Sequence, residues 1–314
     1  MKIHKTTLRI ITILLISIIF GTIQLHASNP EFTDTALKPH DLKILTWNIY
    51  MLPLCSRLHG NCKRAEVIAR EITHYNYDII VFEEAFDFRA RKILRNQLRG
   101  DFPFMYGPAN ETSFSFRINS GIWILSKVPL RQLEQIEFRN RFGVDAIARK
   151  GAVLFEGEWQ GQPFQLLGTH LQNDSPDNVR HGQCQEISDK LLRKYARADV
   201  PQIVCGDFNT EFDDKVNYCD MLRILDAENG SLQGSLQASF DEVDNKLAQK
   251  KNGKRQLIDY VLIRNNKAIK AIERKVTAIK NRVQDIYSDL SDHYGIEAII
   301  RFKNHPADVL TLLH

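Results

Sequence analysis

Short apolar runs recur along the chain and predict β-strands. Several of these runs are rich in β-branched residues and are bounded by Gly, Pro, Asp or Asn, which is typical of buried strands. The runs cover residues 42–47, 79–82, 121–125, 152–155, 164–168, 203–205, 258–263 and 296–300.

Other stretches follow a helical period. Residues 64–72 place their apolar side chains on one face of a predicted helix, and residues 88–98 and 179–195 behave similarly, with charge on the opposite face. The polar, lysine-rich residues 241–255 predict an exposed loop or hairpin. Many strands with a few helices favour an α/β sandwich in which the helices cover the outer faces of the sheets.

The first residues of the chain resemble an export signal rather than part of a fold. Three cations precede the apolar residues 10–20, and small residues follow around Ala27. This order predicts a secretory signal peptide over residues 1–27. An uncleaved membrane anchor is the alternative, but the apolar run is shorter than the roughly 20 residues that a spanning helix needs.

The rest of the chain predicts one domain. No linker rich in Pro, Gly or Ser and no internal repeat divides it, so we expect an extension over residues 28–40, a single domain over 41–303 and a tail over 304–314. Cleavage of the signal predicts a protein that is secreted or periplasmic.

Charge weakly disfavours a dedicated nuclease. The formal charge of the 314 residues is +4, and the signal contributes three cations and no acids, which leaves about +1 for the remaining 287 residues. Proteins that hold duplex nucleic acid through many phosphate contacts usually have a stronger basic surplus. We therefore expect no stable nucleic-acid partner.

Five cysteines cannot all pair within one chain. Cys55 and Cys62 lie in one loop-like stretch, and export favours a disulfide between them. Cys205 lies inside an apolar run and is expected to be a buried thiol. The sequence leaves Cys184 and Cys219 undecided, and no cysteine spacing resembles a zinc site.

Polar residues stand at five points where an apolar run ends. A hard divalent cation such as Mg²⁺ prefers oxygen ligands, usually one or two carboxylates with water and substrate phosphate. A histidine beside such an ion can generate hydroxide from water. The pattern therefore predicts metal-assisted cleavage of a phosphate ester. The residues are Asn48, Glu84, His170, Asp207 with Asn209, and Asp292 with His293.

Each of these residues also has an ordinary structural interpretation. Asn48 could turn the chain after a strand, and Glu84 could begin a solvated helix. Asp207 and Asn209 could belong to a simple turn, because Gly, Asp and Asn favour turns. A lone His170 is more often a satisfied or exposed histidine than a catalyst. The occurrence of all five points on one chain favours the catalytic interpretation.

The polar points form an ordered set of motifs. The set is Thr46-Trp47-Asn48, Phe82-Glu83-Glu84, Gly168-Thr169-His170, Gly206-Asp207-Phe208-Asn209, Ile258-Asp259-Tyr260 and Ser291-Asp292-His293-Tyr294. It resembles the endonuclease/exonuclease/phosphatase superfamily over residues 42–299. Within that superfamily, Asn48-Ile-Tyr-Met-Leu52, Glu84-Ala-Phe-Asp87 and Gly168-Thr-His-Leu-Gln172 are most similar to the secreted bacterial neutral sphingomyelinase C branch.

The resemblance implies a four-layered α/β/β/α sandwich, the DNase I-like fold, with the site at one end of two packed sheets. It also implies a metal site. Glu84 corresponds to the principal Mg²⁺ ligand, with Asn48 and Asp292 nearby, and Mn²⁺ or Co²⁺ could replace Mg²⁺. Asp207 and Asn209 would hold the phosphate, the attacking water or a second metal.

The resemblance further implies how protons move. His293 would be the general base that activates water, oriented by Asp259. His170 would stabilise the transition state or protonate the leaving alkoxide. The expected protein is a monomer that acts on a phospholipid at a membrane surface, releasing phosphocholine and leaving ceramide. The sequence leaves the choice of headgroup open.

Two features depart from the branch or remain ambiguous. Residues 280–290 lack the Trp or Phe of the membrane-entering hairpin in related enzymes, so we expect weaker interfacial binding. Phe138 and Phe142, with Arg139, Arg141 and Arg149, could form another lipid-facing loop or a solvated basic loop.

Two rival functions share the same scaffold. One is a secreted DNase I-like endonuclease, and the other is a catalytically silent effector that binds a membrane or a host. A phosphoinositide phosphatase is disfavoured because residues 256–260 lack the Trp-Cys-Asp-Arg signature of that branch.

Overall fold

The computed structural model describes residues 41–53, 60–112, 118–143, 147–173, 176–248, 252–283 and 286–303, with backbone only at 286–287. These residues belong to one compact unit, His40–His314. The expected signal peptide (1–27), extension (28–40) and tail (304–314) lie outside the described residues. Cys55 also lies outside them, and Cys62 has a free thiol.

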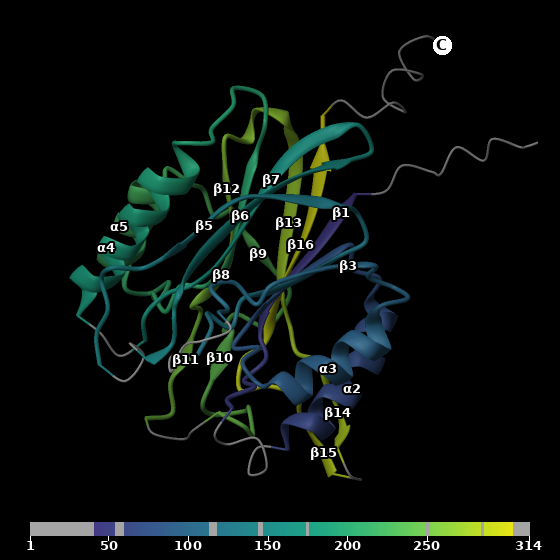
Figure 1. The fold of residues 1–314 in the computed structure, drawn as a ribbon. Helices are drawn as coiled ribbons and strands as arrows, with labels where there is room; N and C mark the ends of the chain where they lie inside the picture. Colours follow the sequence, from purple (N-terminus) through teal and green to yellow (C-terminus); the bar gives the residue numbers. More distant parts are fainter. Residues whose placement is uncertain are drawn as a thin grey trace, which may run out of the picture. The chain divides into compact units, whose positions relative to one another are not determined.

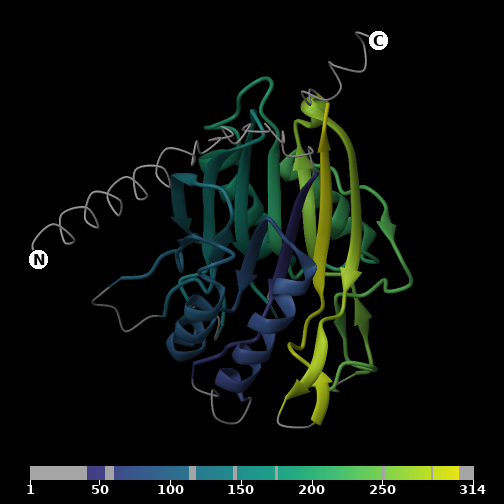
Figure 2. The same cartoon turned by 90° about the vertical axis from the view of Figure 1, so that its right-hand side faces the viewer.

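Two sheets pack face to face. In the first, β1 runs parallel to β2 and antiparallel to β16, and Figure 2 shows β1, β16 and β13 side by side (purple, yellow and yellow-green). Its strands, in order across the sheet, are β3 (Phe104–Tyr106), β4 (Trp123–Ser126), β2 (Ile79–Glu83), β1 (Leu42–Asn48), β16 (Gly295–Phe302), β13 (Ile269–Thr277) and β9 (Leu232–Gln233).

The second sheet has one parallel pair, β7 with β8, and is otherwise antiparallel. It packs closely on the first sheet at Gly168, where an added Cβ would lie 3.1 Å from Ile122 Cγ2 and 3.2 Å from Val81 Cγ1. Its strands, in order, are β12 (Asp259–Arg264), β8 (Gln202–Asp207), β7 (Gln162–His170), β6 (Gly151–Trp159) and β5 (Leu130–Glu137).

Helices cover the outer face of each sheet (Figure 1). Helices α2 (Asn61–Tyr75) and α3 (Phe88–Leu98) pack on the outward side chains of β1 and β2 in one core cluster. Helices α4 (Asp177–Ile187) and α5 (Lys215–Leu225) lie on the other side, against the second sheet. The predicted α/β/β/α sandwich is therefore confirmed.

The alternating direction of the side chains along β1 explains this layering. Ile44 belongs to the core between the sheets, whereas its neighbour Leu45 belongs to the core beneath α2 and α3. Successive side chains of a strand point to opposite faces, so a strand that is buried on both faces is apolar almost throughout. The continuous apolar runs of the sequence are the consequence.

Two hairpins lie outside the large sheets. Strands β10 (Phe240–Asp241) and β11 (Arg255–Gln256) pair at the two ends of the polar stretch 241–255 that was predicted as a loop or hairpin. Strands β14 (Lys280–Val283) and β15 (Ile286–Asp289) form the second hairpin. None of the helices among the described residues has the length and apolar character needed to cross a membrane.

Candidate active site

Strand register brings three of the predicted residues together on the second sheet. His170 is paired with Asp207 across the parallel strands β7 and β8. Asp207 is in turn paired with Asp259 across β8 and β12. All three side chains are almost completely buried. Their proximity follows from the register of three strand ends, which no local sequence spacing encodes.

Hydrogen bonds at the end of β1 bring Asn48 and His293 to the same site. Asn48, at the end of β1, donates from Nδ2 to Asp207 Oδ2 at 3.1 Å. Trp47 Nε1 donates to the His293 carbonyl at 2.9 Å, and Ser291 Oγ donates to the Asn48 carbonyl at 2.6 Å. The segment that carries His293 is thus attached to the end of β1.

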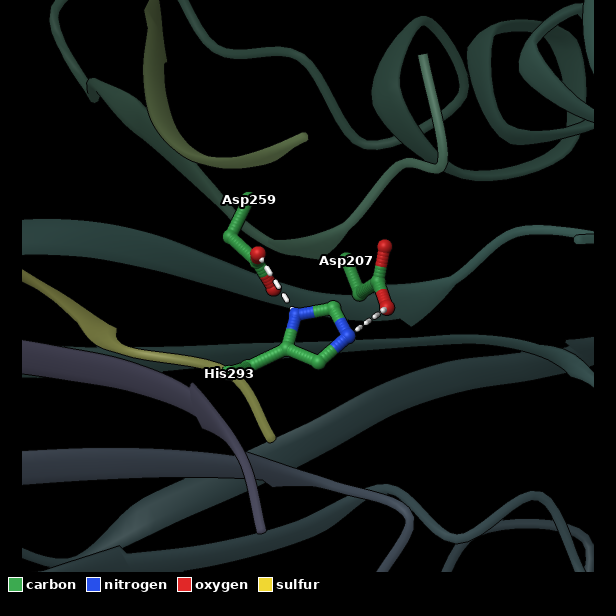
Figure 3. A group of neighbouring side chains, drawn as sticks. All are labelled: Asp207, Asp259 and His293. Carbon is green, nitrogen blue, oxygen red and sulfur yellow. Dashed lines mark hydrogen bonds and ion pairs between the residues drawn. The ribbon is translucent and has the colours of Figure 1, made fainter. Parts of the chain in front are cut away.

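His293 lies between two carboxylates (Figure 3). Its Nδ1 is 2.9 Å from Asp259 Oδ2, and its Nε2 is 3.8 Å from Asp207 Oδ2. Burial alone would lower the pKa of His293, but Asp259, Asp207 and Asp292 raise it well above its ordinary value. Without a bound cation the imidazole is therefore protonated near neutral pH.

Glu84 places a carboxylate oxygen in the site that no described hydrogen-bond donor satisfies. The residue follows β2 with a left-handed backbone (φ 52°), and its Oε2 is buried. Burial, followed by the nearby charge of Asp292, raises the pKa of Glu84 to about 7. Burial also raises the pKa of Asp292, and burial with Asp259 raises that of Asp207 to about 7.

Burial is the largest cause of these raised pKa values, and a neighbouring carboxylate is the second cause for Glu84 and Asp207, so a cation that reached the site would stabilise the charged carboxylates. An unpaired buried carboxylate oxygen is unfavourable unless a metal or a donor reaches it. The chemistry of the donors, carboxylates and an amide oxygen, suits Mg²⁺ or Mn²⁺. The residues present therefore fit a hard divalent ion on the side of the site formed by Glu84 and Asp292.

A second group could also hold an ion. Ligand atoms of Asp207, Asp259 and His293 lie within 4.8 Å of one another. However, His293 Nδ1 already has a hydrogen bond to Asp259 Oδ2, which leaves only Asp259 Oδ1 buried and without a partner among the described residues. Glu84 has no comparable side-chain partner among the described residues and lines the cleft, which Asp259 does not, so Glu84 is the better candidate for a principal metal ligand.

His170 has a different environment. Its Nε2 lies 3.1 Å from Lys150 Nζ and 3.5 Å from Asp207 Oδ2. Its Nδ1 is buried and has no hydrogen-bond partner among the described residues, so no carboxylate orients this ring as Asp259 orients His293. Burial and the Lys150 ammonium hold the pKa of His170 well below its ordinary value, so the ring is neutral.

Lys150 is a site residue that the sequence analysis missed. Besides facing His170, its Nζ donates to the Leu171 carbonyl at 3.0 Å, and the side chain is buried. The antiparallel register of β6 and β7, with Ala152 opposite Thr169, brings Lys150 to the end of β7. Nothing in the local sequence distinguishes it from the other cations of that stretch.

Asp207 and Asn209 both belong to the site and form a turn. Asn209 has a left-handed backbone (φ 48°), and its N–H donates to Asp207 Oδ1 at 3.0 Å. Asn209 Nδ2 donates to the Leu171 carbonyl at 3.1 Å. Gly206 has φ 153°, and a Cβ there would lie 2.0 Å from the Thr169 carbonyl oxygen. Only glycine allows β7 and β8 to approach this closely.

The site residues line a cleft of about 410 Å³, with Tyr50, Asn173, Phe240 and Lys254 among its other walls. A neighbouring cavity of about 630 Å³ shares His293, Asn209 and Phe240 with this cleft and extends to Phe142 and Arg180. The cleft could therefore hold a phosphate ester while the cavity holds a substituent of that phosphate. Asn48, Glu84, His170, Asp207, Asn209, Asp292 and His293 all face the cleft.

The loop considered as either lipid-facing or solvated is exposed over residues 139–143, whereas Phe138 before it is not. Phe138 is fully buried, so the idea that it faces lipid is wrong. Phe142 is 49% exposed, and its backbone is held on both sides by Gln172, which accepts from its N–H at 3.3 Å and donates to its carbonyl at 2.8 Å. The loop therefore presents a single, well-anchored aromatic side chain beside the cleft.

Comparisons with known proteins agree with this geometry. The profile of the Endonuclease/Exonuclease/phosphatase family matches residues 45–293. A Phospholipase C of Staphylococcus aureus is 28% identical over 288 residues, which cover 82% of this chain and 87% of the relative. A Sphingomyelinase C of Bacillus cereus is 27% identical over 318 residues, covering 89% and 95%. A mutant beta toxin from Staphylococcus aureus, solved with bound magnesium ions, matches with a TM-score of 0.73 at 26% identity, covering 83% of this chain and all (100%) of that one.

Proposed function

This chain belongs to the Endonuclease/Exonuclease/phosphatase family, and from that membership we propose that it is a metal-dependent phosphodiesterase that hydrolyses sphingomyelin or a related phospholipid to ceramide and phosphocholine. One observation carries the proposal. A buried histidine held by Asp259 faces the same cleft as Glu84, a carboxylate with an unpaired buried oxygen. The names of the relatives suggest the lipid substrate.

The metal would be held by Glu84, with Asn48 and Asp292 completing the protein ligands. When bound, Mg²⁺ (or Mn²⁺ or Co²⁺) neutralises phosphate charge and offsets the clustered carboxylates, which lowers the pKa of His293 toward neutrality. Asp207 and Asn209 lie beside this position and would hold the phosphate or the attacking water, although Asp207 could also serve a second ion.

His293 would act as the general base. Its Nδ1 is held by Asp259 at 2.9 Å, which fixes the ring so that Nε2 faces the cleft. Nε2 takes a proton from water as the water oxygen attacks phosphorus, and the bond to the ceramide oxygen breaks. Oriented general-base catalysis contributes typically about 10²–10⁴-fold to such a reaction.

His170 and Lys150 would act on the negative charge that develops on the phosphoryl group and the leaving oxygen. The Lys150 ammonium lies 3.1 Å from the neutral His170 ring, so the pair presents positive charge and hydrogen-bond donors without a second base. The pair either stabilises the charge that develops on the phosphoryl oxygens or supplies a proton to the departing alkoxide. Preorganised electrostatic stabilisation of this kind often lowers the activation barrier more than any other catalytic effect.

The location of the protein is part of the same proposal. We infer that it is exported and acts, secreted or periplasmic, as a monomer on phospholipid at a membrane surface. The basic and apolar start of the chain supports export. The site faces a cleft with an adjoining cavity, which suits one phosphodiester with its headgroup rather than a long polymer.

The test is release of headgroup from a panel of phospholipids, with Mg²⁺ and with EDTA, beside a plasmid-DNA arm. We expect release of phosphocholine from sphingomyelin that EDTA abolishes, and little cleavage of DNA. DNA cleavage without lipid hydrolysis would instead identify the DNase I-like rival. A protein that retains its biological effect after His293→Ala would support the catalytically silent effector.

A further inference from the structure

Two buried arginines hold the turns that carry the proposed metal ligands. Arg64 on α2 and Arg91 on α3 are only 2% and 6% exposed, and both direct their guanidinium groups at backbone carbonyls. We propose that they are positioning residues that fix the geometry of Asn48, Glu84 and Asp292. The inference rests on the proposed function, because it assigns these arginines to the metal site of that function.

Arg64 joins two segments that are distant in the sequence. Its Nη1 donates to the carbonyls of Ile49 at 2.9 Å and Leu290 at 2.7 Å. Its Nη2 donates to the carbonyl of Tyr50 and to Asn61 Oδ1, the latter at 3.0 Å. Ile49 and Tyr50 follow Asn48 directly, and Leu290 lies two residues before Asp292. One guanidinium therefore connects the turn after Asn48 to the segment that carries Asp292.

Arg91 holds the third turn. Its Nη1 donates to the carbonyls of Ala85 at 2.5 Å and Phe86 at 2.8 Å, the two residues that follow Glu84. Its Nη2 forms an ion pair with the exposed carboxylate of Glu111 at 3.1 Å. The guanidinium thus contacts the backbone immediately after the principal proposed ligand on one side and the exposed Glu111 on the other.

The two arginines belong to one network. Asn61, which accepts from Arg64, donates from Nδ2 to Asp87 Oδ2 at 3.1 Å. Asp87 caps the start of α3, the helix that carries Arg91. Between them, Met51 N–H donates to the Glu84 carbonyl at 3.1 Å. A shift at either arginine would therefore be transmitted to both ligand-bearing turns.

The backbone of these turns explains why such anchoring is needed. Tyr50 and Glu84 both have left-handed conformations, with φ of 50° and 52°, which are unfavourable for residues other than glycine. The carboxylates of Glu84 and Asp292 also repel each other across the site. Without fixed partners for the carbonyls, the turns would relax, and the ligands would separate.

Lysine cannot replace arginine in this role. A guanidinium is a planar fork that donates to several carbonyls at fixed angles, whereas an ammonium is a single point of charge on a flexible stem. Substitution by Lys keeps the charge and most of the side-chain volume. Arg64→Lys and Arg91→Lys therefore remove the directed hydrogen bonds while preserving the net charge.

The first experiment measures Mg²⁺ binding directly, by calorimetric titration of the full exported chain in the absence of lipid. Removing partners that orient metal ligands typically weakens metal binding by roughly 10–100-fold. We expect Arg64→Lys and Arg91→Lys each to weaken Mg²⁺ binding by about tenfold or more. The second readout, in metal-free protein, is faster hydrogen exchange at the amides of Ile49 and Met51.

Two matched controls separate positioning from general destabilisation. Arg274 is also 2% exposed, and its Nε donates to the Val261 carbonyl at 2.6 Å, in a part of the protein that does not line the cleft. Arg274→Lys should lower the melting temperature but leave Mg²⁺ affinity within about twofold. Glu111→Gln removes the ion pair of Arg91 but not its carbonyl bonds, and it should leave Mg²⁺ affinity unchanged.

The outcomes distinguish this inference from the proposed function. The Arg64→Lys and Arg91→Lys proteins could melt at a lower temperature, as Arg274→Lys does, and still bind Mg²⁺ with the affinity of the wild type. That result would overturn the positioning role. Wild-type protein that binds Mg²⁺ but hydrolyses no phospholipid would refute the proposed function, while the binding comparison would still decide the role of the arginines. Wild-type protein that binds no divalent cation would overturn both.

Discussion

At the scale of single residues, the two histidines of the cleft differ because their neighbours differ. His293 is held by a carboxylate at Nδ1, whereas His170 faces an ammonium at Nε2 and has no partner for Nδ1 among the described residues. Carboxylates favour the protonated imidazole, and a cation disfavours it. The same side chain can therefore act as a base at one position and remain neutral at the other.

The first prediction concerns His293. His293→Ala should lower turnover of sphingomyelin at saturating Mg²⁺ by at least about 10²-fold, because it removes the group that accepts the proton of water. Initial rates of phosphocholine release measure this. His74→Ala, which changes an exposed histidine on α2, is the control and should have no effect. Near-normal hydrolysis by the His293 variant would remove the base from the proposed mechanism.

The second prediction concerns Lys150. Lys150→Met removes the ammonium beside His170 while keeping an unbranched apolar stem, so turnover should fall by roughly 10-fold or more, since charge stabilisation at the phosphoryl group is lost. Lys150→Arg keeps the charge and should retain more activity than the Met variant. Equal activity of wild type and the Met variant would show that Lys150 only packs against His170.

The sequence identified most residues of the cleft, but it could not identify Lys150. Motifs such as Gly206-Asp207-Phe208-Asn209 keep their chemistry within a few positions, so they can be read locally. Lys150 acquires its role only from the register that places it beside the end of β7. The arginines 64 and 91 are similar cases, because their carbonyl partners belong to other elements.

At the scale of elements, strands buried on both faces could be predicted and partly exposed strands could not. Each predicted apolar run overlaps a strand, and residues 88–98 form α3 as expected. Strands β5 and β13 were missed because each alternates apolar with charged residues, and each has a bulge that interrupts the alternation, between Gln132 and Glu134 in β5 and between Ile269 and Ala271 in β13.

Two helical regions also departed from expectation. The helix predicted over residues 179–195 ends earlier, as α4, and continues as a π-helical turn, Ser188–Leu192. The five-residue π-turn shifts the helical period, so the apolar pattern alone could not locate this break. Helix α5 was missed although its buried residues, Tyr218, Met221, Ile224 and Leu225, recur at a helical spacing and pack against the second sheet, so the signal for it was present in the sequence.

The third prediction concerns the anchored loop beside the cleft. Phe142→Asp should reduce sedimentation with sphingomyelin liposomes and lower activity on bilayers more than on detergent-dispersed substrate, because Phe142 offers apolar surface where lipid would approach. Val216→Asp, at a 74% exposed site on α5 that lines neither the cleft nor the adjoining cavity, is the matched control. Unchanged liposome binding by the Phe142 variant would leave a solvated basic loop as the better interpretation.

At the scale of the whole molecule, the cleft couples stability to pH and to metal. Glu84 and Asp207 have pKa values of about 7, and burial also raises that of Asp292. The carboxylates around His293 outweigh its burial and raise its pKa as well. These cleft groups together therefore bind more protons in the folded metal-free protein than in the unfolded chain, at pH values between about 4 and their folded pKa values. His170, whose pKa is lowered, has the opposite effect below about pH 6.5, but it is a single group, whereas the pKa is raised at the four groups just named.

The fourth prediction follows from the sign of this linkage. When the folded state binds more protons, stability falls as pH rises, so metal-free protein should melt at a higher temperature at pH 5.5 than at pH 7.5. Mg²⁺ competes with those protons for the carboxylates, so it should raise the melting temperature strongly at pH 7.5 and weakly at pH 5.5. At 100 times its dissociation constant, a ligand stabilises the folded state by about 2.7 kcal/mol.

Glu84→Gln provides the decisive comparison in the same melting experiment. The amide removes one buried charge, so the metal-free variant should lose less stability between pH 5.5 and pH 7.5 than the wild type does. It also removes the principal proposed ligand, so the effect of Mg²⁺ at pH 7.5 should largely disappear. If Mg²⁺ stabilised this variant as much as the wild type, the ion would have to bind elsewhere, and the site formed by Asp207, Asp259 and His293 would become the stronger candidate.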